Sequence, residues 1–222
     1  MSKQIAARML GDDYQALYFW LKVCEMFQPH NNIEKVGYEY DQIKAFDDVV
    51  VFYNEKVPDK SMTPIVADYF QLKFHVTNSE YFTYENLMDP KAINATSVSI
   101  LQRIHNAQKE FTPTGEHIRF YIVTPWHPHP DDALKELISN EDGQIRLDKL
   151  SQGGPRSKFG KVREAWKDHL GVATDDELMT ALKPVRFNLG TRTITELQAQ
   201  LNESLLINGF KPISNTLSLI HI

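Results

Sequence analysis

Cysteine is almost missing from this chain of 222 residues, since Cys24 is the only one. A single thiol excludes an internal disulfide and is typical of proteins kept in a reducing cytoplasm. Long apolar runs are missing too: the longest are strand-sized, too short to cross a bilayer. Residues 1–8 also lack the apolar stretch of a secretory signal. We therefore expect a cytoplasmic protein with no membrane partner.

An excess of positive charge is also absent. The chain has 24 lysines and arginines against 29 acidic residues, a net charge of −5. This balance argues against a protein that coats nucleic acid non-specifically, but it allows a local basic groove beside an acidic metal site. The hydrophobic fraction of 42% and the charged fraction of 24% are ordinary for a globular protein. At this length the chain can bury a substantial core.

Hydrophobic spacing in the first third of the chain predicts one helix followed by three strands. The helix covers residues 3–27, although Gly11 could divide it into two pieces. The predicted strands are residues 33–40, 48–53 and 65–76. Residues 54–64 hold two prolines and four charged residues, which is typical of a hairpin loop.

A second helix and a fourth strand complete a predicted core of order α-β-β-β-α-β. The helix is expected over residues 92–111 and the strand over 118–123. Beyond them the chain is mainly helical, with expected elements at residues 133–139, 158–170, 175–182, 185–189 (a short strand) and 193–208. We therefore expect an α/β fold with a core over residues 1–130. Residues 131–222 would form a helical extension that packs on it and offers a surface for DNA, a partner or self-assembly.

Three polar residues stand where two of the predicted strands meet. Side chains two apart in a strand share a face, so Gln71 and Lys73 point one way, while Phe70, Leu72 and Phe74 point into a core on the other. Asp48 opens the neighbouring strand and can reach the same point. A buried lysine in an apolar strand is costly unless it is paired or faces a cleft.

Together these residues match what a metal-dependent phosphodiesterase needs. Mg²⁺ or Mn²⁺ takes oxygen ligands, which Asp48 can supply as a carboxylate, Gln71 as an amide and Leu72 as a backbone carbonyl. Lys73 would orient the attacking water and offset negative charge on the phosphate. The simpler interpretation of Lys73 is an edge-strand lysine that blocks aggregation, and Asp47 competes with Asp48 as the acid.

This arrangement resembles the PD-(D/E)XK nuclease superfamily, in which the first acid lies on the second strand and the (D/E)xK triplet on the third. The triplet Gln71-Leu72-Lys73 is similar to that of the Mrr-like restriction endonucleases, and the chain resembles the double-stranded DNA endonuclease effector domains of bacterial antiphage systems over residues 5–125. The resemblance implies a restriction-endonuclease-like core with a mixed sheet flanked by helices.

The resemblance also adds two residues to the expected site. Those domains open with a helix bearing a glycine, an aromatic and a glutamine, matched by Gly11, Tyr14 and Gln15, and carry a glutamate on the first strand, matched by Glu39. Glu39 is implied as a further metal ligand, and Gln15 as a residue that supports the metal or positions water. The chain departs from the family pattern because no proline precedes the acid and the triplet has no carboxylate.

Two other motifs attract attention. The most basic stretch, residues 152–163, offers four candidate contacts to a DNA backbone: Arg156, Lys158, Lys161 and Arg163. A solvated helix start is the equally simple interpretation. His127 and His129 alternate with prolines, which favours a rigid surface loop over a metal site.

The sequence therefore predicts a Mg²⁺- or Mn²⁺-dependent DNA endonuclease that acts as an antiphage effector. Such an enzyme needs restraint, so we expect control by a sensor protein or domain, or by self-assembly. The alternative from another class is a degenerate nuclease fold that binds a partner or nucleic acid without cutting. A ribonuclease or a single-strand nuclease on the same fold also stays open.

Overall fold

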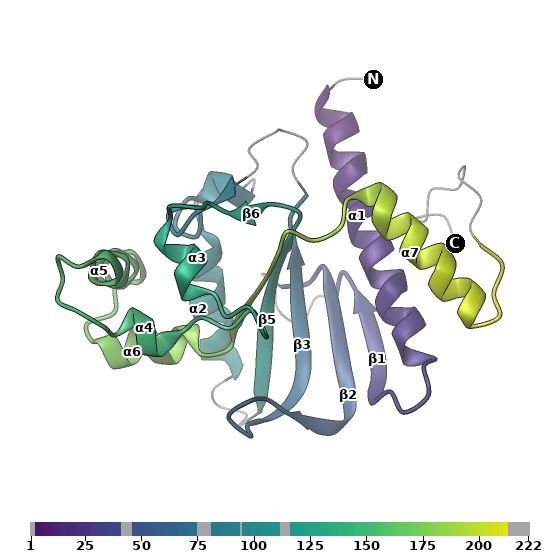
Figure 1. The fold of residues 1–222 in the computed structure, drawn as a ribbon, viewed down its shortest axis with the longest axis horizontal. Helices are drawn as coiled ribbons and strands as arrows, with labels where there is room; N and C mark the ends of the chain where they lie inside the picture. Colours follow the sequence, from purple (N-terminus) through teal and green to yellow (C-terminus); the bar gives the residue numbers. More distant parts are fainter. Residues whose placement is uncertain (1–2, 41–45, 75–80, 94, 112–115, 213–222) are drawn as a thin grey trace.

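A five-stranded mixed sheet forms the centre of the molecule in this computed structural model, which describes residues 3–40, 46–74, 81–93, 95–111 and 116–212. The strand order is β1-β2-β3-β5-β7. β1, β2 and β3 pair with one another in antiparallel, and β5 and β7 continue the sheet from β3 in parallel. The expectation of an α/β fold with a mixed sheet is confirmed (Figure 1).

The first predicted elements are present with small changes in their bounds. They are α1 (Lys3–Met26), β1 (Ile33–Tyr38) and β3 (Pro64–Leu72). Gly11 does not divide α1. A glycine inside a helix costs only about 1 kcal/mol, and the buried side of α1, with Tyr14, Leu17 and Leu21, contributes more than that by packing on the sheet.

The predicted hairpin is present, but its loop is shorter than residues 54–64, because β2 (Val49–Pro58) continues well into that range before it pairs with β3. The Asn32 side chain makes two hydrogen bonds to the Glu55 backbone. Its Oδ1 accepts the Glu55 N–H at 3.0 Å, and its Nδ2 donates to the Glu55 carbonyl. The turn itself is short because Asp59 Oδ1 accepts the N–H groups of Ser61 and Thr63, both at 2.8 Å. A register shift between Phe52 and Val57 accommodates the extra length.

The middle of the chain returns through β5 (His117–Thr124), which pairs with β3 in parallel. The predicted helix over 92–111 is shorter: a 3-10 turn, η1 (Pro90–Ile93), precedes α2 (Ile100–Phe111). The predicted loop after β5 contains a short strand, β6 (His127–Pro128), that pairs with β4 (Tyr81–Phe82). The order α-β-β-β-α-β nevertheless holds for the larger elements.

The rest of the chain follows the expected pattern, with one short helix, over residues 147–150, that was not predicted. Its elements are α3 (Ala133–Leu137), α4 (Leu147–Leu150), α5 (Lys158–Leu170), α6 (Asp175–Leu182), β7 (Val185–Leu189) and α7 (Ile194–Ile207). β7 pairs with β5, and α7 packs against α1. The chain after residue 130 is therefore built into the same sheet and the same helical layer as the chain before it.

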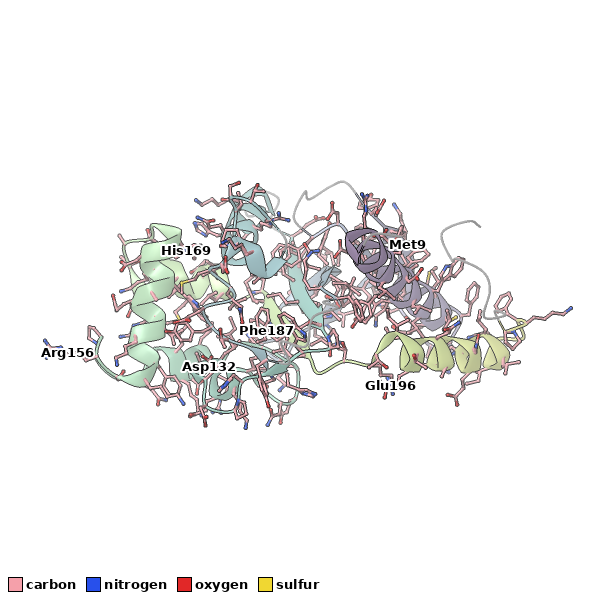
Figure 2. The ribbon with its side chains drawn as sticks, turned by 90° about the horizontal axis from the view of Figure 1, so that it is seen from above. Met9, Asp132, Arg156, His169, Phe187 and Glu196 are labelled. Atoms are coloured by element: carbon pink, nitrogen blue, oxygen red, sulfur yellow. The ribbon has the colours of Figure 1, made fainter. Side chains whose placement is uncertain are left out.

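Two hydrophobic clusters lie on opposite faces of the sheet. The first joins the sheet to helices α2 to α6 and includes Val50, Tyr69, Ile104, Phe120 and Trp166. The second joins it to α1 and α7 and includes Tyr14, Leu17, Phe70, Leu72 and Leu201. Figure 2 shows the separation, with Met9 of α1 and Glu196 of α7 on one side of the molecule and Arg156 and His169 on the other.

Candidate active site

The acid and the amide of the predicted trio are in direct contact. The pairing of Val49 with Phe70 places Asp48, just before β2, opposite Gln71 near the end of β3. Asp48 Oδ2 accepts a hydrogen bond from Gln71 Nε2 and a second, at 2.6 Å, from the Leu72 N–H. Two strands running in opposite directions thus bring residues 23 and 24 positions apart to one point.

Asp48, and not Asp47, supplies the carboxylate that faces Gln71. The two acids differ because neighbouring side chains in an extended segment point to opposite faces. The backbone carbonyl of Asp47 accepts the Tyr40 N–H at 2.8 Å, which ties this segment to the end of β1. Of the two aspartates left open by the sequence, the geometry favours Asp48.

Burial dominates the electrostatics of Asp48. It raises the pKa of this carboxyl from 3.8 to about 6, and the charge of Asp47 adds to the increase. The Lys73 ammonium, the Leu72 N–H and the Gln71 amide act in the opposite direction. A carboxylate that is costly to ionise in this position gains from a nearby cation, which is the electrostatic condition for a metal ligand.

Lys73 lies just beyond β3, on the face that carries Gln71. Its backbone N–H donates to the Val123 carbonyl at 2.8 Å, so the pairing with β5 continues to this residue. Burial lowers the pKa of its amine, and the positive charge of Arg103 lowers it further, whereas Asp48 and Asp47 raise it. The prediction that Phe70 and Leu72 occupy the other face is confirmed by their place beside α1.

Arg103 is a charged neighbour of the site that sequence reasoning missed. It lies in the first turn of α2, the helix that packs over this face through Ile100 and Ile104. No motif marks it, since a half-buried arginine in an amphipathic helix is ordinary. Only the packing of α2 on β3 and β5 brings its charge close to Lys73.

Of the two residues added by the resemblance, Glu39 is tied to Asp48 by its backbone, and Gln15 belongs to the helix that covers the other face of the sheet. Glu39 is not on β1, which ends at Tyr38; it is exposed, with a φ of 45°, and its N–H donates to the Asp48 carbonyl at 3.2 Å. Gln15 is half-buried on α1, next to Tyr14, whose hydroxyl lies 2.6 Å from Thr191 Oγ1. Their parts in metal binding stay predictions.

The four basic residues predicted to contact DNA in residues 152–163 differ in their exposure. Arg156, Lys158 and Lys161 are exposed at the start of α5, and Lys158 pairs with Glu136 at 2.6 Å. Arg163 is only 5% exposed and donates to the carbonyl of Leu150 at the end of α4, at 2.8 Å, and to that of Gly153 in the following loop, at 3.0 Å. Its burial does not fit the predicted DNA contact, because the guanidinium holds the loop in place. Figure 2 shows Arg156 at the outer end of the molecule.

Carboxylate-rich metal clusters are not found in the part of the chain that the structure describes, where no three His, Cys, Asp or Glu side chains gather to hold a metal ion. His127 lies in β6, and the His129 ring packs on that of Tyr81 with 5.0 Å between the ring centroids. The predicted ligand set is of another kind, since it takes amide and backbone oxygens. Among the described residues, no helix has the length and apolar character needed to span a bilayer.

One curated protein is clearly similar to this chain. It is CD-NTase-associated protein 4 of Enterobacter hormaechei subsp. hoffmannii (strain UCI 50), 40% identical over 213 residues. The match covers 94% of this chain but 42% of that protein, so the chain spans less than half of the relative's length. No protein-family profile matches the chain.

Two solved structures show a weaker likeness. Both are of the Acinetobacter baumannii Cap4 SAVED/CARF-domain containing receptor, one of them with the cyclic trinucleotide 3'3'3'-cAAA. Their TM-scores are 0.41 and 0.40 at 14% identity, over 88% of this chain and 36% of theirs. A likeness this weak does not define the fold.

Proposed function

We propose that the chain is a metal-dependent endonuclease that hydrolyses phosphodiester bonds in double-stranded DNA, with a fold of the PD-(D/E)XK, Mrr-like type. The observation that carries the proposal is the contact of Asp48 with Gln71 and Leu72 beside Lys73. The acid, the amide and the buried amine satisfy one another only in part, because burial still raises the pKa of Asp48 and lowers that of Lys73. They do match the needs of a site that binds a cation and a phosphate together.

The donor set fits a hard divalent cation. Asp48 contributes a carboxylate and Gln71 an amide oxygen. The Leu72 N–H points to Asp48, and the N–H and carbonyl of one strand residue point to the same side, so its carbonyl is directed there too. Mg²⁺ or Mn²⁺ prefers such oxygen ligands, and Glu39, whose backbone N–H donates to the Asp48 carbonyl, would add a further carboxylate. The metal supplies Lewis-acid activation of the phosphate.

The remaining residues supply binding and proton handling. Lys73, whose pKa is lowered by burial, can hold the attacking water and offset charge that develops on the phosphate oxygens. Gln15 would position water from the α1 side. Exposed cations of α5, namely Arg156, Lys158 and Lys161, offer backbone contacts outside the site.

The relative supports a place in antiphage defence. Its name says that it is associated with a CD-NTase, and more than half of its length lies outside the match. We infer that the nuclease is a cytoplasmic effector restrained by a sensor region, a partner protein or self-assembly. Restraint follows from the chemistry, because backbone-directed cleavage has little sequence selectivity of its own.

Plasmid cleavage tests the proposal. Native protein is incubated with supercoiled DNA and Mg²⁺ or Mn²⁺, with and without EDTA, and compared with Lys73→Ala and with Lys22→Ala on the opposite face. Cutting that requires metal, is lost in Lys73→Ala and persists in Lys22→Ala supports the site. Cutting that survives in Lys73→Ala contradicts it. Labelled RNA and single-stranded DNA in parallel decide the substrate class.

A non-catalytic binding module is the second candidate. It is favoured by the triplet, which lacks a carboxylate, and by the lack of a three-carboxylate cluster among the described residues. Metal titration separates the two, since a nuclease should bind Mn²⁺ through Asp48 whether or not it is activated. If calorimetry detects Mn²⁺ binding by native protein and not by Asp48→Asn, the enzyme is supported. If native protein binds no Mn²⁺, the non-catalytic module is supported.

A further inference from the structure

A lysine shares the face of the sheet that carries the site but lies on another strand. Cross-strand pairs share a face, and Lys35 of β1 pairs with Phe52, which pairs with Ala67 of β3. Ala67 lies four residues before Gln71, so all of them point to one side of the sheet. Figure 1 shows α2 to α6 gathered beside β5, away from β1.

The Lys35 ammonium is held in place by aromatic rings. Nζ lies 4.3 Å from the Tyr40 ring centroid and 5.3 Å from that of Phe52, and it donates to the Tyr40 hydroxyl at 3.3 Å. The residue itself is exposed, while Tyr40 and Phe52 are half-buried. A cation ordered on a ring loses less side-chain entropy when it binds an anion than a free lysine does.

No carboxylate of the described residues forms an ion pair with Lys35. Lys22 makes the contrast clear. It also lies over two rings, those of Tyr18 and Phe70, but its Nζ pairs with Glu25 at 2.8 Å on the opposite face. Of these two ring-bound lysines, Lys35 keeps its charge available to an external anion.

We propose that Lys35 is a positioning residue that binds a DNA backbone phosphate beside the site. Phe52, its partner in β2, is four residues from Asp48, which at 3.3 Å per residue is about 13 Å. Phosphates of one DNA strand wind around the helix axis as well as advancing along it, so a contact at this distance falls within a few nucleotides of the scissile bond. The inference rests on the proposed function, because it takes Asp48 as the point of cleavage.

Binding without metal tests the contact independently of cleavage. The affinity of a fluorescent 30-base-pair duplex is measured by anisotropy in EDTA from 50 to 200 mM salt. We expect Lys35→Met to weaken binding several-fold and to reduce the slope of log K against log salt by about 0.9, the value for one phosphate. Lys35→Arg should keep the native slope, as should Lys22→Met.

The register of the contact is tested by removing phosphate charge from the DNA. A neutral methylphosphonate is placed at successive positions from the site that native protein cuts. Neutralisation at one position within a few nucleotides of the cut should weaken native binding and have no further effect in Lys35→Met. An equal effect in both proteins overturns the proposal.

The possible failures are distinguishable. Suppose that no metal supports cleavage, but that the slope of log K against log salt is reduced in Lys35→Met and not in the control variants. The phosphate contact then stands and the proposed function fails. If native protein cuts DNA and Lys35→Met keeps the full slope, the function stands and Lys35 has no such role. Circular dichroism of each variant checks that the fold is intact, and Lys35→Arg preserves the charge if the methionine variant is unstable.

Discussion

At the scale of single residues, the main feature of the site is the buried carboxylate of Asp48. Asp48 keeps its carboxylate between the Gln71 amide and the Leu72 N–H, and burial still raises its pKa to about 6. The hydrogen bonds therefore do not fully replace the lost solvation. This imbalance makes the residue useful for metal binding and costly for stability.

The pH dependence of stability should expose that cost. The folded chain keeps the Asp48 proton to a higher pH than the unfolded chain does. The free energy of unfolding therefore falls as the pH rises from about 4 to about 6. Asp48→Asn keeps an acceptor oxygen without the charge. We expect it to be more stable than native protein at pH 8 by on the order of 1–3 kcal/mol and equal at pH 4.

Urea denaturation in EDTA at both pH values measures this difference, and plasmid cleavage should be lost in the same variant. The charge of Lys73 is already included in the pKa of about 6. A native protein as stable as Asp48→Asn at pH 8 would therefore show that the ionised carboxylate has compensating partners in solution.

Arg103 should control the protonation of Lys73. Its positive charge lowers the pKa of that amine, so Arg103→Met is expected to raise it and to move the alkaline limb of the cleavage profile to higher pH. Arg192→Met, an exposed arginine at the start of α7, is the control. An alkaline limb that stays in place in Arg103→Met would assign that limb to another group.

The sequence predicted the contact of Asp48 with Gln71 because it depends on alternation and on neighbouring strands, both of which are visible in the chain. Arg103 was missed, because its part in the site comes from how α2 packs on β3 and β5. The first strand was predicted two residues too long and so included Glu39, because a left-handed backbone at φ 45° ends β1 at Tyr38 without a glycine to mark it.

At the scale of elements, local signals explain what was predicted well. The bounds of α5 and α6 match the expectation because caps are local: Ser157 accepts the Gly160 N–H, and Thr174 forms a capping box with Glu177. β4 and β6 were missed, since two-residue strands at Tyr81 and His127 have no pattern of their own. They exist only through pairing between distant segments.

Three central strands are joined by one buried ion pair. Asp68 of β3 accepts from Arg119 of β5 at 2.6 and 2.7 Å and from the Tyr53 hydroxyl of β2 at 2.6 Å. Burial alone would lower the pKa of Arg119, but the hydrogen bonds and charge of Asp68 raise it. Removing one partner leaves a charge without compensation in the interior.

Arg119→Met should therefore lower the free energy of unfolding by about 3–5 kcal/mol. Tyr53→Phe, which removes the hydrogen bond to Asp68 and the longer one from Arg119, should cost about 1–2 kcal/mol. Chemical denaturation at pH 7 measures both. The double variant Arg119→Met with Asp68→Asn should recover part of the loss. If Arg119→Met were as stable as native protein, Asp68 would be solvated in solution.

At the scale of the whole molecule, the sheet carries two helical layers that are built from both ends of the chain. α1 from the start packs with α7 from the end, and β7 extends the sheet beyond β5. The site lies where β2 begins and β3 ends, beside both layers. A boundary at residue 130, as expected from the helical pattern, would cut through both the sheet and the α1–α7 layer.

The molecule should consequently unfold as one unit. Leu201 of α7 is 1% exposed in the cluster with Tyr14, whereas Trp166 of α5 is buried in the other cluster. Leu201→Ala should lower stability by about 2–5 kcal/mol. In a variant that keeps Trp166 as its only tryptophan, fluorescence and far-UV circular dichroism should shift to the same lower midpoint.

Leu206→Ala is the matched control, because this leucine of the same helix is 59% exposed and should change stability by less than about 0.5 kcal/mol. Coincident transitions would mean that the stability lost at Leu201 on the α1–α7 face is lost equally at Trp166 on the α5 face, so that both layers unfold together. Two separate transitions, or a Trp166 signal whose midpoint does not move in Leu201→Ala, would instead mean that residues 131–222 contain a unit that unfolds independently.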